Sequence, residues 1–299
     1  MQPLSAKVDE LLLECAWSLW TELGVKGTQR LHSDCIVALE ELIVLTVLLA
    51  SIDPRLRDEA LDWCTRNHHF VSISRLKALV KRFGEAVGTP FSFFAATLNA
   101  TSRTHWPLFS VVDALKFSPS GKSSAPQCAR GALLNLRLRA LFGAGARADL
   151  LTYFITQDKN SLTAADATET GYSKRSLAEI LDSFIQSGLF QVNMKRNQQI
   201  YSFVKKEQMK GIIGAIPKVT PPWNQILEVI LPLRTILSQI ENKSLELRVI
   251  EIRKLLSMLQ ETLARFQLTP PPFNADLSVY WDAFIDWLFK SLPLLLSLK

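Results

Sequence analysis

The stretch of residues 145–204 reads GARADLLTYFITQDKNSLTAADATETGYSKRSLAEILDSFIQSGLFQVNMKRNQQIYSFV. The order of its patterns predicts a helix, a short helix, a tight turn, a second helix and a two-stranded ribbon with a basic tip. Each part of that order carries its own sequence signal.

Start and stop signals mark the helices of this stretch. Thr163 and Asp166 resemble a capping box, with Asp in place of the usual Glu, and predict a short helix through Thr170. Gly171 stands where the chain must turn sharply, and Ser173 predicts the N-cap of the next helix. We therefore expect two helices joined by a tight turn.

The second helix is predicted to bury one face and expose the other. Its apolar residues recur at helical spacing and should face inward: Leu177, Ile180, Leu181 and Phe184. The outward face then holds Lys174, Arg175, Ala178, Glu179 and Asp182. Gly188 predicts a left-handed cap. Strands are expected at 190–192 and 200–204, with Lys195 and Arg196 in the polar loop between them.

The phrases TGYSKRSLAEILDSFIQSGLF and KRNQQIYSF resemble the winged helix-turn-helix of bacterial transcription regulators, such as the multiple-antibiotic-resistance and arsenic-responsive repressor types. The resemblance covers roughly one fifth of the chain. It implies a helix in the major groove of duplex DNA and a ribbon over the flanking backbone. Winged helices also serve as protein–protein scaffolds, so that alternative stays open.

Positive charge is concentrated around this stretch. The chain has 34 basic and 28 acidic residues, and residues 128–210 alone hold 12 basic and 7 acidic ones. A local excess of this kind is the electrostatic footprint expected for a polyanion partner. A solvated basic face is the alternative.

Composition and cysteine spacing suggest a cytoplasmic globular protein. Apolar residues make up 48% of the 299, which is typical of a folded chain with real cores. The four cysteines are widely scattered, which favours reduced thiols over a disulfide framework. The N-terminus is amphipathic and carries acids early, unlike a secretory signal. The longest apolar run, 42–52, is too short to span a bilayer.

The chain is expected to be mainly α-helical and to divide at segments rich in proline, glycine or serine. We predict an all-helical N-terminal domain (1–117), a flexible linker (118–127), a winged helix-turn-helix domain (128–215) and a helical C-terminal region (216–299). Helices are expected near 4–23, 33–52, 54–66, 74–83, 91–100, 223–240, 245–266 and 277–296.

The C-terminal region carries a possible dimer seam. An apolar stripe follows one helix at spacings of three and four: Leu245, Val249, Ile252, Leu256, Leu259 and Leu263. Such a stripe is more often an ordinary core face. Winged-helix regulators are nevertheless commonly dimers, because paired half-sites raise affinity and specificity.

The sequence offers few candidate motifs for catalysis or cofactor binding. His32, Cys35, Cys64 and His68 could in principle bind zinc, but their spacing fits no zinc motif. Gly143 and Gly145 lack the strand and the GK[ST] continuation of a phosphate loop. Aromatic residues at 91–109 are better explained as core than as a pocket. We expect neither catalysis nor a cofactor.

The sequence therefore predicts a DNA-binding transcriptional regulator, with a protein-interaction scaffold as the alternative. The expected DNA-binding residues are Tyr172, Ser173, Lys174, Arg175, Lys195 and Arg196. Arg175 could pair with guanine, and Lys195 and Arg196 with phosphate. Tyr172 either stacks on sugar or packs in the turn. Glu179 and Asp182 would repel phosphate and limit how deeply the helix enters.

Overall fold

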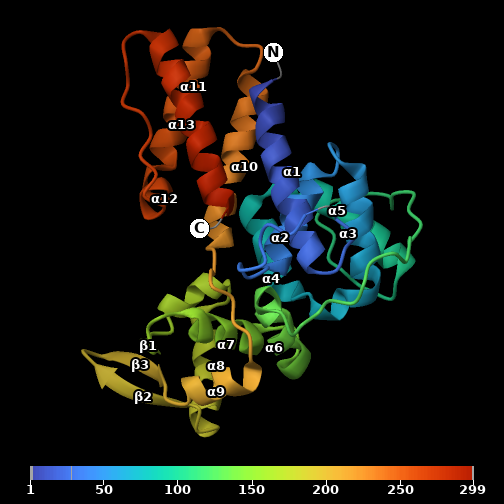
Figure 1. Ribbon diagram of the computed structural model, residues 1–299, viewed down its shortest axis with the longest axis vertical. Helices are drawn as coiled ribbons and strands as arrows, with labels where there is room; N and C mark the ends of the chain where they lie inside the picture. The colour runs from blue at the N-terminus through green and yellow to red at the C-terminus, as the bar shows by residue number, and fades with distance from the viewer. Residues whose placement is uncertain (1–2, 28, 298–299) are drawn as a thin grey trace. The chain divides into compact units, whose positions relative to one another are not determined.

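The computed structural model describes residues 3–27 and 29–297 and is mainly helical, as predicted (Figure 1). Within these ranges the one sheet is three-stranded and antiparallel, in the order β1-β3-β2. The chain divides into two compact units, Leu19–Thr220 and Met1–Ser18 with Pro221–Lys299. Helix α1 (Leu4–Glu22) begins in one unit and ends in the other. No helix in the described ranges has the length and apolarity needed to cross a membrane.

The larger unit, Leu19–Thr220, contains a helical bundle centred on α2 (Leu39–Leu49), which packs against α3 (Pro54–Asn67), α4 (Ile73–Phe83) and α5 (Glu85–Thr101). Nearly every residue of α2 is buried, including Glu40 and Glu41; a mostly apolar sequence of this kind is typical of a helix surrounded by protein. Asp53 caps α3 by accepting from the Leu56 backbone N–H at 3.1 Å, and Pro54 starts that helix.

Helix α2 begins later than the sequence predicts. We expected a helix from Ser33, but residues 35–37 are extended instead, with Cys35 in an isolated parallel bridge to Val219. The Ile36 N–H donates to the Val219 carbonyl at 3.0 Å and the Val37 N–H to the Ala132 carbonyl at 2.9 Å. The pairing partners lie far along the chain, so no local pattern could reveal them.

The predicted flexible linker, 118–127, is fixed to the bundle. The Asp62 carboxylate accepts from the Gly121 N–H at 2.7 Å and from the Ser123 hydroxyl at 2.9 Å. The Ser124 N–H donates to the Gly24 carbonyl at 2.8 Å. Residues 118–127 therefore form a strap across one compact unit and do not separate two units. Composition predicted the absence of helix and strand but could not predict the buried acceptor.

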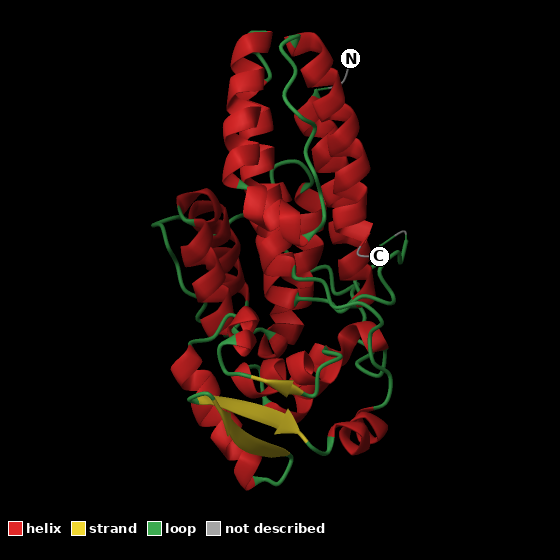
Figure 2. Cartoon of the chain, turned by 90° about the vertical axis from the view of Figure 1, so that its left-hand side faces the viewer, coloured by secondary structure: helices red, strands yellow, loops and turns green. Residues whose placement is uncertain are grey.

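Residues 128–220 complete the larger unit. The 3₁₀ helix η2 (Gly131–Leu133) leads into α6 (Leu134–Phe142), which is followed by α7 (Ala146–Thr156), strand β1 (Ser161–Leu162), the 3₁₀ helix η3 (Asp166–Thr170) and α8 (Lys174–Gln186). Strands β2 (Phe190–Lys195) and β3 (Gln198–Phe203) form a hairpin before α9 (Lys206–Ile213). Figure 2 shows the three strands beside these helices.

The local start and stop signals of this stretch are confirmed. The Thr163 N–H donates to the Asp166 carboxylate at 2.8 Å and the Asp166 N–H to the Thr163 hydroxyl at 3.2 Å, as in a capping box. Gly171 has φ +85° and Gly188 φ +71°, which suits glycine. The helix through Thr170 is a 3₁₀ helix, and β1 was not predicted because two residues are too few for an alternating pattern.

Stacked aromatic rings form the core below the hairpin. The Phe190 and Phe203 rings lie 4.4 Å apart between centroids, and the Phe154 ring meets Phe190 edge-on at 4.8 Å. All three side chains are buried, and Leu177 and Leu181 of α8 join the same cluster. This apolar contact fixes both α8 and the base of the hairpin to α7.

The smaller unit consists of the first part of α1 with α10 (Trp223–Ile240), α11 (Leu245–Met258), α12 (Gln260–Arg265) and α13 (Leu277–Ser297). The single helix expected over 245–266 is broken at Leu259. Five of the six residues of the apolar stripe are buried, and α11 packs against α10 and α13 of the same unit. The stripe is therefore a core face, and a dimer would need another surface.

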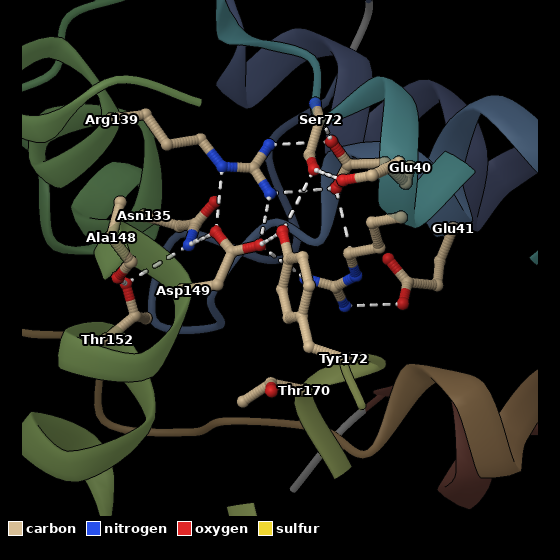
Figure 3. A network of polar contacts seen from close by, with 12 residues as sticks. Glu40, Glu41, Ser72, Asn135, Arg139, Ala148, Asp149, Thr152, Thr170 and Tyr172 are labelled. Atoms are coloured by element: carbon tan, nitrogen blue, oxygen red, sulfur yellow. Dashed lines mark hydrogen bonds and ion pairs between the residues drawn. The ribbon is translucent and has the colours of Figure 1, made fainter. Parts of the chain in front are cut away.

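A network of buried charges connects the helical bundle to residues 134–172 (Figure 3). The Arg139 side chain of α6 is fully buried; its Nη1 donates to Glu40 of α2 at 2.7 Å and its Nε to Asp149 of α7 at 2.9 Å. Arg75 of α4 adds ion pairs to Glu41 at 2.5 Å and to Asp149 at 3.6 Å. Three carboxylates thus share two guanidinium groups.

The carboxylates of the network differ in their pKa. Burial raises the pKa of Asp149, but Arg139 and Arg75 outweigh burial and lower it to about 2. Burial and the neighbouring Glu40 carboxylate raise the pKa of Glu41 above its usual value, and Arg75 offsets this increase only in part. With one carboxylate more than the guanidinium groups can neutralise, Glu41 is the member least favourable as an anion.

We expect Asp149→Asn to lower the free energy of unfolding by about 3 kcal/mol or more at pH 7, because two buried guanidinium groups lose a charged partner. The folded pKa of Asp149, about 2, is depressed below its unfolded value of about 3.9. Its contribution is therefore complete above about pH 4 and is lost as the pH falls toward 2. Urea unfolding at pH 7 and pH 3 should show the difference from wild type shrinking at the lower pH.

Glu41→Gln is the matched control for that experiment. Because its folded pKa is raised, the contribution of Glu41 is complete only below its unfolded pKa and is lost as the pH rises. We therefore expect Glu41→Gln to cost much less than Asp149→Asn at pH 7. Equal losses for the two variants would contradict this assignment.

Candidate nucleic-acid interface

The first turn of α8 presents two cations to solvent. The Ser173 hydroxyl accepts from the Ser176 N–H at 3.2 Å, so Ser173 is the N-cap of α8, as predicted. Lys174 and Arg175 follow it and are exposed. The N–H groups of a helix N-terminus and its dipole attract anions, and exposed cations beside them add to that attraction.

One of these cations has an acidic neighbour. The Arg175 Nε lies 3.2 Å from the Glu179 carboxylate one turn along α8, and the two side chains are 91% and 67% exposed. An exposed pair of this kind contributes about 0.3–0.5 kcal/mol, so Arg175 can exchange Glu179 for another anion at little cost. Asp182 is exposed further along the helix. The face is therefore mixed in charge beyond its first turn.

The hairpin carries the second pair of predicted cations at its tip. Lys195 ends β2 and pairs in register with Gln198, so only two residues form the turn. Arg196 and Asn197 have φ values of +47° and +62°, which match a type I′ turn. The expected polar loop 193–199 is therefore mostly strand, and both Lys195 and Arg196 are exposed.

Tyr172 lies in the turn before α8 and packs inward. Its hydroxyl donates to Asp149 at 2.8 Å and lies 2.9 Å from the Ser72 hydroxyl. Figure 3 shows the ring directed toward these two residues. Burial and the nearby Asp149 carboxylate raise the pKa of Tyr172, which keeps the hydroxyl protonated and able to donate. Of the two roles weighed from sequence, the geometry favours packing in the turn.

Four of the twelve cationic side chains in residues 128–210 already bind carboxylates or backbone carbonyls of the protein itself. Arg139 belongs to the buried network, Arg130 pairs with Glu22 at 2.6 Å, and Lys206 donates to the Gln157 carbonyl. Arg137 donates to the backbone carbonyls of Cys128, Arg130, Ile213 and Ala215. The basic surface is therefore smaller than the sequence count suggests. The cations that remain exposed are Arg147, Lys159, Lys174, Arg175, Lys195, Arg196 and Lys205.

Sequence reasoning missed the network that holds the turn in place. The available signal was two charged residues among apolar neighbours: Arg139 in the segment 132–142 and Asp149 near the start of α7. Charges that interrupt an apolar face require partners, but the partners Glu40 and Arg75 lie in a different part of the chain. Adjacent charged residues such as Glu40 and Glu41 diverge around a helix and would be expected to face solvent, but both are buried.

The cysteines and histidines considered for zinc do not form a site in the structure. Within the described ranges, no group of three or more His, Cys, Asp or Glu side chains is arranged to hold a metal ion. None of the four cysteines, all of which lie within the described ranges, forms a disulfide. Burial raises the pKa of Cys35 to about 11, with smaller contributions from Asp34 and Glu22, so this thiol is unreactive at neutral pH.

No family model, curated protein or solved structure matches this chain.

We expect Tyr172→Phe to lower the free energy of unfolding by about 1–3 kcal/mol, because it leaves the buried Asp149 carboxylate without one charge-assisted hydrogen bond. Tyr153→Phe is the matched control, since its hydroxyl donates to the Asp166 carbonyl at 3.1 Å in an exposed setting. Chemical denaturation of both variants measures the difference. A larger loss for Tyr153→Phe would show that the Tyr172 hydroxyl does not stabilise the turn.

Proposed function

We propose that residues 145–204 form a winged helix-turn-helix that binds duplex DNA, and that the protein is a transcriptional regulator of the bacterial type. The observation that carries the proposal is the exposed N-terminal turn of α8, with Lys174 and Arg175 beside the Ser173 cap. A two-residue hairpin tip with two further exposed cations supports it. Four cysteines without a disulfide among the described residues are compatible with a reducing cytoplasm.

In this proposal the two cationic pairs have different tasks. The first turn of α8 enters the major groove, where Arg175 could contribute about 1–3 kcal/mol of discrimination by bidentate pairing with guanine. Lys195 and Arg196 contact the flanking phosphates or minor groove and add affinity with little sequence information. Tyr172 is not expected to contact DNA. It supports the turn before α8 instead, because its hydroxyl donates to Asp149.

The acidic residues of α8 limit the specificity we propose. Glu179 and Asp182 lie on the exposed face of the helix, where they repel phosphate unless one of them accepts from a cytosine amine. Contacts are therefore concentrated in the first turn of α8 and at the hairpin tip. We expect binding to depend more on backbone contacts than on base contacts.

The second candidate function is a protein-interaction scaffold. Strand β2 is an edge of the sheet, and its Val192 and Met194 side chains are 38% and 67% exposed. An exposed edge with apolar side chains can accept a strand from a partner. In that case the basic tip would be a solvated surface, and DNA binding would be absent at low salt.

We expect wild-type protein to bind duplex DNA with an affinity that falls steeply as salt rises. Lys195→Ala/Arg196→Ala should reduce the slope of log K against log salt by about 1.8, because each lost phosphate contact removes about 0.9. Lys174→Ala/Arg175→Ala should weaken binding but reduce this slope by less, because Arg175 is assigned to a base. Fluorescence anisotropy with a labelled duplex at several salt concentrations measures these slopes.

Lys116→Ala/Lys122→Ala is the matched control, because it removes two exposed cations of the same unit from a loop outside residues 145–204. We expect its slope to equal that of wild type. No binding by wild type at low salt, or equal effects of all three double variants, would exclude the proposed interface and leave the scaffold function.

Glu179→Gln should tighten DNA binding about two- to threefold at low salt, because it frees Arg175 from an exposed ion pair and removes a charge that repels phosphate. Glu207→Gln is the control: Glu207 pairs with Lys210 at 3.0 Å on α9 and is 77% exposed. We expect little change for the control. Weaker binding by Glu179→Gln would instead assign Glu179 to a base contact.

A further inference from the structure

A polar cavity of about 480 Å³ lies in the larger unit, away from residues 145–204. Its wall is formed by the end of α1, the residues that follow it and the strap that leads to Arg130. Its volume falls within the range typical of small-molecule binding sites. Charged groups line it: Glu22, Lys26, Arg30 and Arg130.

Glu22 occupies this cavity wall at an energetic cost. It is 1% exposed, and it is the last residue of α1, where the helix dipole disfavours a negative charge. Arg130 Nη2 lies 2.6 Å from one carboxylate oxygen. Among the described residues, however, neither Glu22 oxygen receives a well-oriented hydrogen bond, and Arg130 Nη1 also lacks an acceptor.

Glu41 also has one oxygen without a hydrogen-bond partner, but its other oxygen accepts from Arg75. Both oxygens of Glu22 lack a well-oriented donor, in contrast to two other buried carboxylates of the same unit. Asp62 accepts from Gly121, Ser123 and Arg66, and Asp149 accepts from Arg139, Asn135 and Tyr172. Leaving buried acceptors without donors is destabilising. Glu22 is therefore arranged for hydrogen-bond donors that a bound molecule would supply.

The charges of the lining indicate the class of that molecule. Three cations surround the cavity, and only one acidic side chain accompanies them. Lys26 and Arg30 are exposed at the rim, whereas Glu22 is buried. An anionic group near the rim and hydroxyl donors toward Glu22 would match this division of charge.

The backbone around the cavity is fixed. Gly24 has φ +101°, and a Cβ atom there would lie 2.6 Å from the Ser124 carbonyl oxygen. The Ser124 N–H donates to the Gly24 carbonyl at 2.8 Å. Glycine at position 24 therefore lets the strap close against the end of α1, and this contact shapes the cavity wall.

We propose that this cavity binds a small phosphate ester that carries free sugar hydroxyls, either a sugar phosphate or a mononucleotide. Lys26 and Arg30 bind the phosphate, and the two Glu22 oxygens, one of which lies 2.6 Å from Arg130 Nη2, accept from neighbouring hydroxyls. The site is independent of the proposed DNA interface, because none of these residues belongs to residues 145–204.

The test is isothermal titration of the full chain with ribose 5-phosphate, adenosine 5′-monophosphate, inorganic phosphate and ribose. We expect at least one of the two esters to bind at least tenfold more tightly than inorganic phosphate or ribose. Lys26→Ala/Arg30→Ala should weaken ester binding about tenfold or more, because charge-assisted hydrogen bonds are lost. Lys195→Ala/Arg196→Ala, the same charge change at the hairpin tip and outside the cavity lining, should leave ester binding unchanged.

Glu22→Gln separates the hydroxyl contact from the phosphate contact. It should weaken binding of the ester about tenfold while leaving inorganic phosphate unaffected, and Gln keeps the size of the side chain. Thermal unfolding of each variant verifies that it is folded. The proposal is overturned if neither ester binds better than inorganic phosphate, if Lys26→Ala/Arg30→Ala binds as wild type does, or if Glu22→Gln leaves ester binding unchanged.

Discussion

The buried ion pairs of Arg139 are the interaction on which the larger unit depends. Its guanidinium group lies between Glu40 of the helical bundle and Asp149 of α7 and has no exposed surface. Removing one partner from such a pair leaves a charge in a medium that cannot solvate it. The relative placement of α2, α6 and α7 is therefore specified by charge as well as by apolar packing.

This network also determines which residues of the proposed interface face solvent. Tyr172 donates to Asp149 from the turn before α8, and the apolar side of α8 joins the aromatic core below the hairpin. Once these inward contacts are fixed, Lys174 and Arg175 must point outward. A turn held by these contacts would lower the ordering cost of the proposed binding.

Two buried carboxylates of this unit illustrate the difference between support and function. Asp149 has its hydrogen-bonding capacity filled by side chains of the chain itself. Glu22 lies equally deep but has a single misaligned partner and borders a cavity. The first arrangement stabilises the fold at neutral pH, whereas the second leaves acceptors unused. That contrast is the reason we propose a ligand for the second.

Local sequence signals determined the elements whose stabilising contacts are local. The Thr163–Asp166 capping box, the Ser173 cap and the glycines at 171 and 188 were all predicted, because each depends on residues a few positions away. Long-range contacts instead determine the extended segment at 35–37, the fixed strap at 118–127 and the burial of Glu40, Arg139 and Asp149. Their partners lie tens of residues away, and a charge in the sequence does not reveal whether water or another residue will neutralise it.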